Sequence, residues 1–165
     1  MNLWNLLKLL QGLETKLGQL YAKFSKDFAG QESVSRFFYR LSREEEQHAN
    51  LVKYQQKLVS GQREREKQVA VYTSELDIDT EEIETMLNSV DYYLETAQSM
   101  PLQKALKVTV IFESSAAENH YKTATADVFP ELTELLLKLA DEDNAHKQRV
   151  MEFASTHGVS LQAEE

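Results

Sequence analysis

Apolar residues recur at steps of three and four positions along residues 3–28, which is the period of an amphipathic helix. The stripe consists of Leu3, Leu6, Leu10, Leu13, Leu17, Leu20, Phe24 and Phe28. Similar stripes return in four later segments, and Gly30, Pro101 and Pro130 stand where one segment ends or the next begins. The pattern predicts helices over about residues 2–28, 32–60, 80–98, 101–126 and 130–157.

The links between these helices differ in length. Short links join the first helix to the second and the fourth to the fifth, whereas residues 61–79, GQREREKQVAVYTSELDID, lose the helical period and are too long for an ordinary connection. Two helical hairpins joined by one long connection are the topology of the ferritin-like four-helix bundle. We predict an all-α protein with a single domain of this kind over residues 1–165, and an extra short helix in the crossover.

Composition agrees with an all-helical protein and excludes several partners. The chain has only five glycines and two prolines, and its formal net charge of -9 disfavours binding to nucleic acid. Lys8, Gln11 and Glu14 interrupt the leucine-rich start, and no apolar run approaches the roughly 20 residues that cross a membrane. We therefore expect a cytoplasmic protein without a membrane partner.

Acidic residues stand on the apolar stripes of the four long helices, where core side chains are expected. They are Glu14, Glu45, Glu113 and Asp143. His48 and His146 each follow an acid by three positions, so that carboxylate and imidazole project from the same side of a helix. Burying unpaired carboxylates would cost several kcal/mol, on the order of 3 kcal/mol for each group. A metal ion removes that cost, and because the chain has no cysteine, only carboxylate and imidazole can bind it.

The two halves of the chain repeat this pattern. LSREEEQH, residues 41–48, aligns without a gap with LADEDNAH, residues 139–146. The repeat predicts two equivalent half-sites that face each other across a pseudo-twofold axis. Tyr21 follows Glu14 by seven positions and Tyr121 follows Glu113 by eight. These tyrosines are either ordinary core residues or donors of hydrogen bonds to ligand carboxylates.

The order E-x6-Y, E-x-x-H, E-x7-Y and carboxylate-x-x-H, over about residues 3–155, resembles the ferritin-like domain of the rubrerythrin family. The resemblance implies a centre of two iron ions, with terminal and bridging carboxylates and two terminal imidazoles. By this resemblance the terminal carboxylates are Glu14 and Glu113, and the bridging carboxylates are Glu45 and Asp143. The terminal imidazoles are His48 and His146. The carboxylate-rich set also suits manganese, and zinc is a substitute in a crystal. No catalytic residue is expected beyond the ligands.

Three features depart from the family pattern. Asp143 replaces a glutamate, so that the second half-site is expected to be displaced, weaker or more open to solvent. Ala116 stands where the peroxidases of the family carry a further glutamate. The cysteine-containing rubredoxin-like module of rubrerythrins is missing, and we therefore expect electrons from another protein or a small reductant.

The main functional hypothesis is an oxidoreductase in which Fe(II) reacts with peroxide or dioxygen, in a protein that forms a homodimer. The alternative is a non-catalytic metal-binding or iron-handling bundle that acts through protein association. The acids beside the ligands, Glu44, Glu46, Asp141 and Glu142, are expected to be solvated charges. His120 lies seven residues after Glu113 and therefore about two turns away along the same helix, so we place it outside the ligand shell.

Overall fold

The computed structural model describes residues 2–66, 80–96, 100–124 and 130–161. The elements in chain order are α1 (Leu3–Asp27), α2 (Glu32–Glu66), α4 (Glu81–Thr96), α5 (Leu102–Ala124) and α6 (Pro130–Thr156). The described residues contain no strand, and the prediction of an all-α helical bundle is confirmed. None of the described helices combines the length and the apolar character that crossing a membrane would require.

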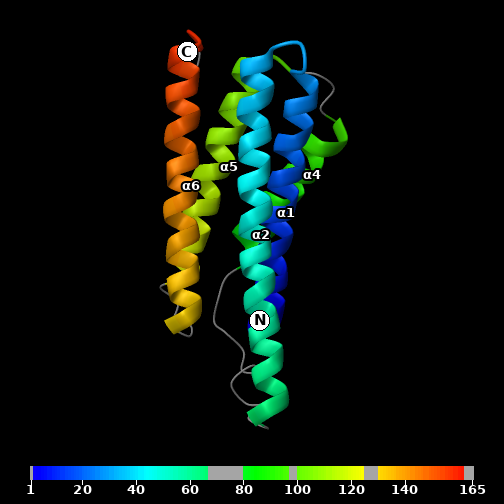
Figure 1. Cartoon of the computed structure of the whole chain (residues 1–165), viewed down its shortest axis with the longest axis vertical. Helices are drawn as coiled ribbons and strands as arrows, with labels where there is room; N and C mark the ends of the chain where they lie inside the picture. The colour runs from blue at the N-terminus through cyan, green and yellow to red at the C-terminus, as the bar shows by residue number, and fades with distance from the viewer. Residues whose placement is uncertain (1, 67–79, 97–99, 125–129, 162–165) are drawn as a thin grey trace.

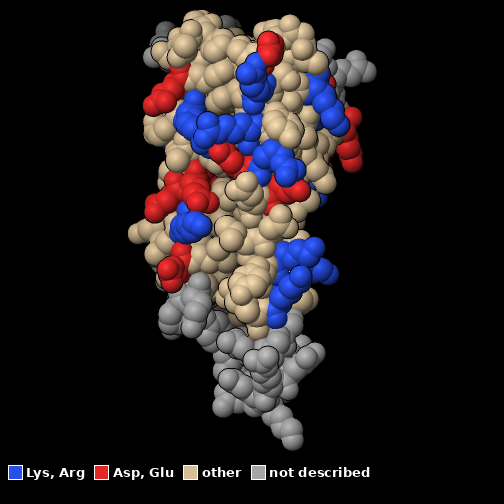
Figure 2. All heavy atoms as spheres, in the orientation of Figure 1, with Lys and Arg blue, Asp and Glu red and all other residues tan. Residues whose placement is uncertain are grey.

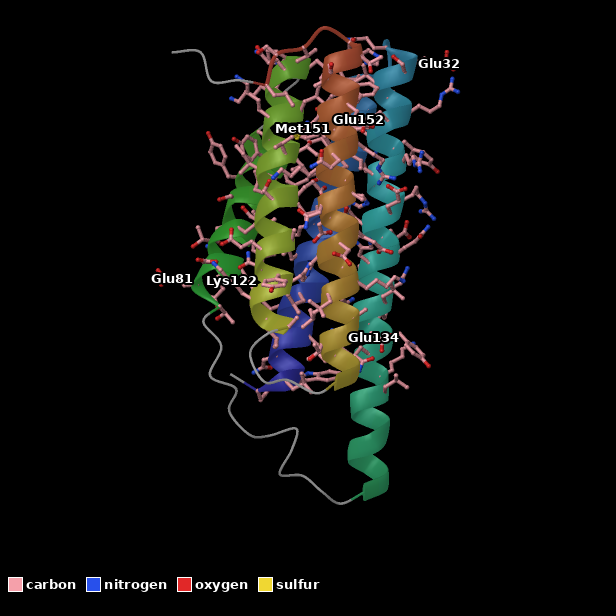
Figure 3. All side chains as sticks on the ribbon, turned by 90° about the vertical axis from the view of Figure 1, so that its left-hand side faces the viewer. Glu32, Glu81, Lys122, Glu134, Met151 and Glu152 are labelled. Carbon is pink, nitrogen blue, oxygen red and sulfur yellow. The ribbon has the colours of Figure 1, made fainter. Side chains whose placement is uncertain are left out.

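The helices form two hairpins that lie side by side. α1 packs along α2, α5 packs along α6, and α2 also contacts α6. Figure 1 shows α6 and α5 on one side of the molecule and α2 and α1 on the other, and Figure 3 shows α6 between α5 and α2. The short helix α4 packs mainly against α1 and touches α5, so it covers α1 from outside the four long helices.

The core follows the predicted apolar stripes. The seven leucines of α1 that face inward are at most 1% exposed, because α2 and α4 cover two sides of this helix. Ile83, Met86 and Val90 form the buried face of α4. Phe24 packs edge-on against Phe38, which links α1 to α2 near the tight turn between them. The apolar layers therefore lie on both sides of the acidic positions along the bundle.

The second helix is longer than its sequence pattern indicated. We expected it to end at about residue 60, but α2 continues to Glu66. Figures 1 and 3 show its C-terminal end extending beyond the other helices. The sequence GQRERE has no apolar stripe, but glutamine, arginine and glutamate favour helix by themselves. The rest of the expected crossover, residues 67–79, lies outside the described residues.

Gly18 marks the closest approach of α1 to α2 at the level of the acidic residues. A Cβ atom at this position would lie 3.3 Å from Glu45 Cβ and 3.3 Å from the backbone oxygen of Ser42. Gly12 lies on the same helix with nothing within 4 Å of such an atom. The absence of a side chain at position 18 therefore lets α2 bring Glu45 against α1.

These two glycines give a matched pair of substitutions. We expect Gly12→Ala to raise the free energy of unfolding by up to about 1 kcal/mol, because alanine has the higher helix propensity. We expect Gly18→Ala to give no gain or a loss, because the backbone of α2 would have to move away. Urea denaturation of the metal-free variants, followed by circular dichroism, measures both values. An equal gain from both substitutions would show that the contact at Gly18 is not tight.

Candidate metal centre

The four acidic residues on the apolar stripes meet inside the bundle. Glu14 comes from α1, Glu45 from α2, Glu113 from α5 and Asp143 from α6, and none is more than 1% exposed. His48 and His146 are each 3% exposed beside them. The structure thus brings all six residues predicted as ligands into one buried cluster. Asp143 itself is buried, and the expectation that the second half-site is displaced, weaker or more open to solvent stays a prediction.

The cluster contains two groups of residues whose ligand atoms lie within 4.8 Å of one another. The first consists of Glu14, Glu45, His48 and Asp143, and the second of Glu45, Glu113, Asp143 and His146. Glu45 and Asp143 belong to both groups, as two bridging carboxylates would. The short side chain of Asp143 therefore concerns both half-sites rather than the second alone.

Each histidine directs one ring nitrogen into the cluster. His48 Nδ1 lies 3.1 Å from Glu45 Oε2 and 3.5 Å from Glu14 Oε2. His146 Nδ1 lies 2.7 Å from Glu45 Oε1 and 3.2 Å from Glu113 Oε2. The two rings are nearly parallel, with centroids 5.2 Å apart. Both Nδ1 atoms therefore sit where they could bind metal ions together with the carboxylates.

The opposite nitrogen of each ring contacts an outer carboxylate from the other hairpin. His48 Nε2 is 2.8 Å from Glu142 Oε2, and His146 Nε2 is 3.4 Å from Glu44 Oε2. A carboxylate behind a histidine fixes the ring and makes the other nitrogen a stronger metal ligand. The expectation that Glu44 and Glu142 are merely solvated is therefore wrong. Glu46 on α2 and Asp141 on α6 are exposed, as expected.

Arginine side chains hold Glu44 in place. Arg149 of α6 donates to both oxygens of Glu44, at 3.2 and 2.5 Å, and Arg40 donates to Oε1 at 3.1 Å. Burial raises the pKa of Glu44, but the hydrogen bonds from Arg149 and Arg40 outweigh it and lower the pKa below its ordinary value. Glu44 therefore stays ionised beside His146. The sequence did not reveal this contact because it depends on how α2 packs on α6.

A small cavity leads from the surface to the two histidines. It has a volume of about 230 Å³ and lies between α2 and α6. Its lining is formed by Glu44, Gln47, His48, Glu142, Ala145, His146 and Arg149. Figure 2 shows basic and acidic side chains intermingled on the face over which α2 runs. The cavity is small and most of its lining side chains are polar, which suits small polar molecules rather than a bulky substrate.

Tyr21 and His120 complete the surroundings of the carboxylates. The buried Tyr21 hydroxyl donates to Glu113 Oε1 at 2.6 Å, so the hydrogen-bonding alternative holds for this tyrosine. Tyr121 is 58% exposed, and neither alternative considered for it is correct. Its neighbour His120 is fully buried instead, with Nδ1 2.8 Å from Asp143 Oδ2 and Nε2 3.1 Å from Glu14 Oε1.

His120 lies outside the two ligand groups, as expected, but sequence reasoning missed that it contacts two carboxylates of the cluster. That expectation counted the distance to Glu113 along α5, but the carboxylates that His120 contacts come from α1 and α6. A signal was present in the sequence, because His120 follows Glu113 by the same seven positions that separate Tyr21 from Glu14. His120 belongs to neither of the two ligand groups.

Several buried side-chain atoms of the cluster have close neighbours but make no hydrogen bond, because the geometry of these contacts is unsuitable. These atoms are Glu14 Oε1 and Oε2, Glu45 Oε1, Asp143 Oδ1 and His120 Nε2. Buried polar atoms are otherwise nearly always hydrogen-bonded in native proteins. Four of these atoms are carboxylate oxygens of the two ligand groups, and buried oxygens without a hydrogen-bond donor are free to bind a metal ion.

The cluster carries more negative charge than its surroundings can neutralise without protons or cations. Burial and the charge of Glu113 raise the pKa of Glu45 to about 8. Burial lowers the pKa of His48 and His146, but contacts with the carboxylates outweigh it and raise these values to about 11 and 10. Burial also raises the pKa of Glu14, but His120 and His48 outweigh it and lower this pKa. The metal-free protein therefore holds protons that metal ions would replace.

The fold and this cluster together define an all-α helical bundle whose buried acidic and histidine residues could form a metal site. Models of protein families, curated protein sequences and solved structures were each compared with the chain, and none matches.

Proposed function

We propose that the chain is a di-iron protein of the ferritin-like type, similar to the rubrerythrin family, and an oxidoreductase that reacts Fe(II) with peroxide or dioxygen. The observation that supports it most is the sharing of Glu45 and Asp143 between two ligand groups, each with its own histidine. A structural ion needs one group of ligands, whereas two groups that share carboxylates suit a pair of ions that act together.

The donor set fits two divalent ions. Four carboxylates balance the four positive charges of such a pair, and His48 and His146 add one neutral nitrogen donor to each group. Oxygen-rich sets with few imidazoles and no thiolate suit iron and manganese more than zinc. Several carboxylate oxygens of the cluster have no hydrogen-bond partner, which is consistent with their binding metal ions. When bound, the iron pair would supply the electrons that reduce the oxidant.

The protein's own residues would orient the ligands and control access. Glu44 and Glu142 hold the two imidazoles from behind, so that both Nδ1 atoms stay directed inward. The cavity between α2 and α6 would admit peroxide or dioxygen along the edges of the histidines and exclude large molecules. An external electron donor would have to return electrons through this face or through the helices, because the chain has no cysteine for a further iron centre.

One observation favours the alternative of a metal-binding or iron-handling protein without turnover. Ala116 is fully buried on α5, one turn after Glu113, where peroxidases of the resembling family have a further carboxylate. Without that carboxylate, the centre would offer fewer oxygen ligands to iron ions whose charge increases on oxidation. The two functions predict different behaviour when a reductant is present. The iron of an oxidoreductase would be reduced and reoxidised repeatedly, whereas the iron of a metal-binding protein would not turn over.

The first test is metal content. Protein purified without chelator is expected to contain about two transition-metal ions per chain, and anaerobic titration of metal-free protein with Fe(II) is expected to saturate at the same ratio. Repeated cycles of reduction and oxidation by peroxide, followed by absorbance, would then separate an enzyme from a storage site. Saturation at one ion per chain, or no binding at all, would contradict the dinuclear centre.

A further inference from the structure

Each terminal carboxylate of the cluster is contacted by a side chain from the opposite hairpin. Tyr21 of α1 donates to Glu113 of α5, and His120 of α5 places Nε2 3.1 Å from Glu14 of α1. Both contacting residues lie seven positions after the carboxylate of their own helix. They therefore occupy equivalent places in the two halves, although one is a phenol and the other an imidazole.

His120 makes a second polar contact through its other ring nitrogen, whereas Tyr21 has a single polar atom and can make no equivalent contact. His120 Nδ1 lies 2.8 Å from Asp143 Oδ2, so one ring touches a carboxylate of α1 and a carboxylate of α6. Asp143 is the equivalent of Glu45 in the repeat and is one methylene shorter. A short side chain reaches less far into the cluster, and its direction therefore depends more on what it contacts.

Burial limits the ways in which the three side chains can rearrange. His120 and Glu14 are fully buried and Asp143 is 1% exposed. Water therefore has little access to replace the contacts, and any rotation of the His120 ring would leave two buried carboxylate oxygens without a nitrogen neighbour. The ring thus couples the orientations of two carboxylates that both belong to the ligand group of His48.

We propose that His120 is a positioning residue of the metal centre, which holds Glu14 and Asp143 in the orientation required by the ion on the His48 side. This inference rests on the proposed metal centre. It makes the two half-sites unequal, because His120 contacts two carboxylates of the first group, Glu14 and Asp143, but only Asp143 of the second. Tyr21 contacts Glu113, which belongs to the second group alone. Residues that orient metal ligands from behind commonly change metal affinity by about 10- to 100-fold when they are replaced.

The test measures metal affinity in each half-site separately, using Co(II) as the probe. His146→Ala leaves the half-site of His48, and His48→Ala leaves the other. Adding His120→Phe, which keeps a ring but removes both nitrogens, is expected to weaken Co(II) binding about 10- to 100-fold in the His146→Ala protein. In the His48→Ala protein we expect a clearly smaller loss, because only one of the two carboxylates that His120 contacts, Asp143, belongs to that group. Calorimetry and the visible spectrum of bound Co(II) report both affinity and geometry.

Three further substitutions separate positioning from packing. The side-chain nitrogen of asparagine is bonded to Cγ, as Nδ1 is, and that of glutamine lies one bond further, as Nε2 does. We expect His120→Asn or His120→Gln in the His146→Ala protein to recover most of the affinity and the Co(II) spectrum. Tyr21→Phe is the matched control, and its effect should fall on the half-site of His146 instead. If packing alone mattered, phenylalanine would be tolerated and the amides would not.

The outcomes distinguish this inference from the proposed centre. Absence of Co(II) binding to the unaltered protein would contradict the metal centre itself. Binding by the unaltered protein, together with unchanged affinity after His120→Phe, would overturn the positioning role alone. If circular dichroism shows that the His120→Phe protein does not fold, a His120→Leu protein replaces it as the variant without ring nitrogens. Equal Co(II) affinities of the leucine, asparagine and glutamine variants would then also overturn the positioning role.

Discussion

The Glu45→Gln substitution is expected to abolish binding of both metal ions, although glutamine has nearly the same shape. Glu45 belongs to both ligand groups, and a neutral amide cannot bridge two cations as a carboxylate does. Glu14→Gln provides the matched comparison, because Glu14 belongs to one group and should affect mainly one ion. Anaerobic Fe(II) or Co(II) titration gives the number of bound ions. If the Glu45→Gln protein still bound two ions, the shared position of this carboxylate would have no functional meaning.

The same substitution should stabilise the metal-free protein at slightly alkaline pH. The pKa of Glu45 rises from an unfolded value of 4.5 to about 8 because of burial and repulsion by Glu113. A group whose pKa is higher in the folded state contributes stability below its unfolded pKa and loses it as the pH rises through the folded pKa. The unaltered metal-free protein should therefore lose stability between about pH 4.5 and 8 through Glu45.

Glutamine has no proton to lose, and the difference should therefore grow over that interval. Near pH 8 we expect Glu45→Gln to unfold with a free energy higher by about 2 kcal/mol, since the lost contacts to His48 and His146 offset part of the gain. Urea denaturation of chelator-treated protein at pH 5 and pH 8 measures it. A variant that is less stable than the parent at both pH values would contradict the assigned charge.

The second large effect is expected from the two histidines. His48→Ala and His146→Ala should each remove most of the oxidant-dependent turnover of the iron-loaded protein, rather than half of it. Reduction of peroxide takes two electrons, and a centre with one half empty cannot share them between two ions. His157→Ala is the control, because this exposed histidine stands just after α6 and lies outside both ligand groups.

The fold should survive both substitutions, because the apolar layers on either side of the cluster hold the bundle together. Stopped-flow absorbance after mixing with peroxide measures the reaction, and circular dichroism of the metal-free variants checks the helices. Iron oxidation at the parental rate in His146→Ala would mean that a single ion is sufficient. The α5–α6 half of the cluster would then be structural.

Much of the fold could be predicted from the sequence because helical period is a local property. The stripes predicted both ends of α1, the start of α5 and the end of α6 to within about one residue, because Gly30, Pro101 and Pro130 favour a helix boundary where each apolar stripe stops or starts. The predicted end of the fourth helix at about residue 126 lies outside the described residues. The end of α2 was missed because its last turns are polar on all sides. Periodicity detects an apolar stripe, and a sequence of polar residues gives no such signal.

The site was predictable where one helix carries the information. The spacing of Glu45 and His48, repeated in Asp143 and His146, placed carboxylate and imidazole on one helix face before any packing was considered. The spacing of residues within one helix cannot predict which side chains meet between two helices. Glu44 reaches His146, and Glu142 reaches His48, only because α2 and α6 lie side by side.

The sequence by itself thus determined an all-α chain, two matched hairpins, and six polar residues on faces that should be buried. Their spacing depends only on the geometry of a helix, which is the same in every protein. The tertiary structure brought Glu45 and Asp143 into both ligand groups, as the resemblance implied, and it alone decided that His120 rather than Tyr121 is the counterpart of Tyr21. These facts depend on the rotation of each helix about its axis. That rotation is set by the packing of all four helices together, and no single segment contains it.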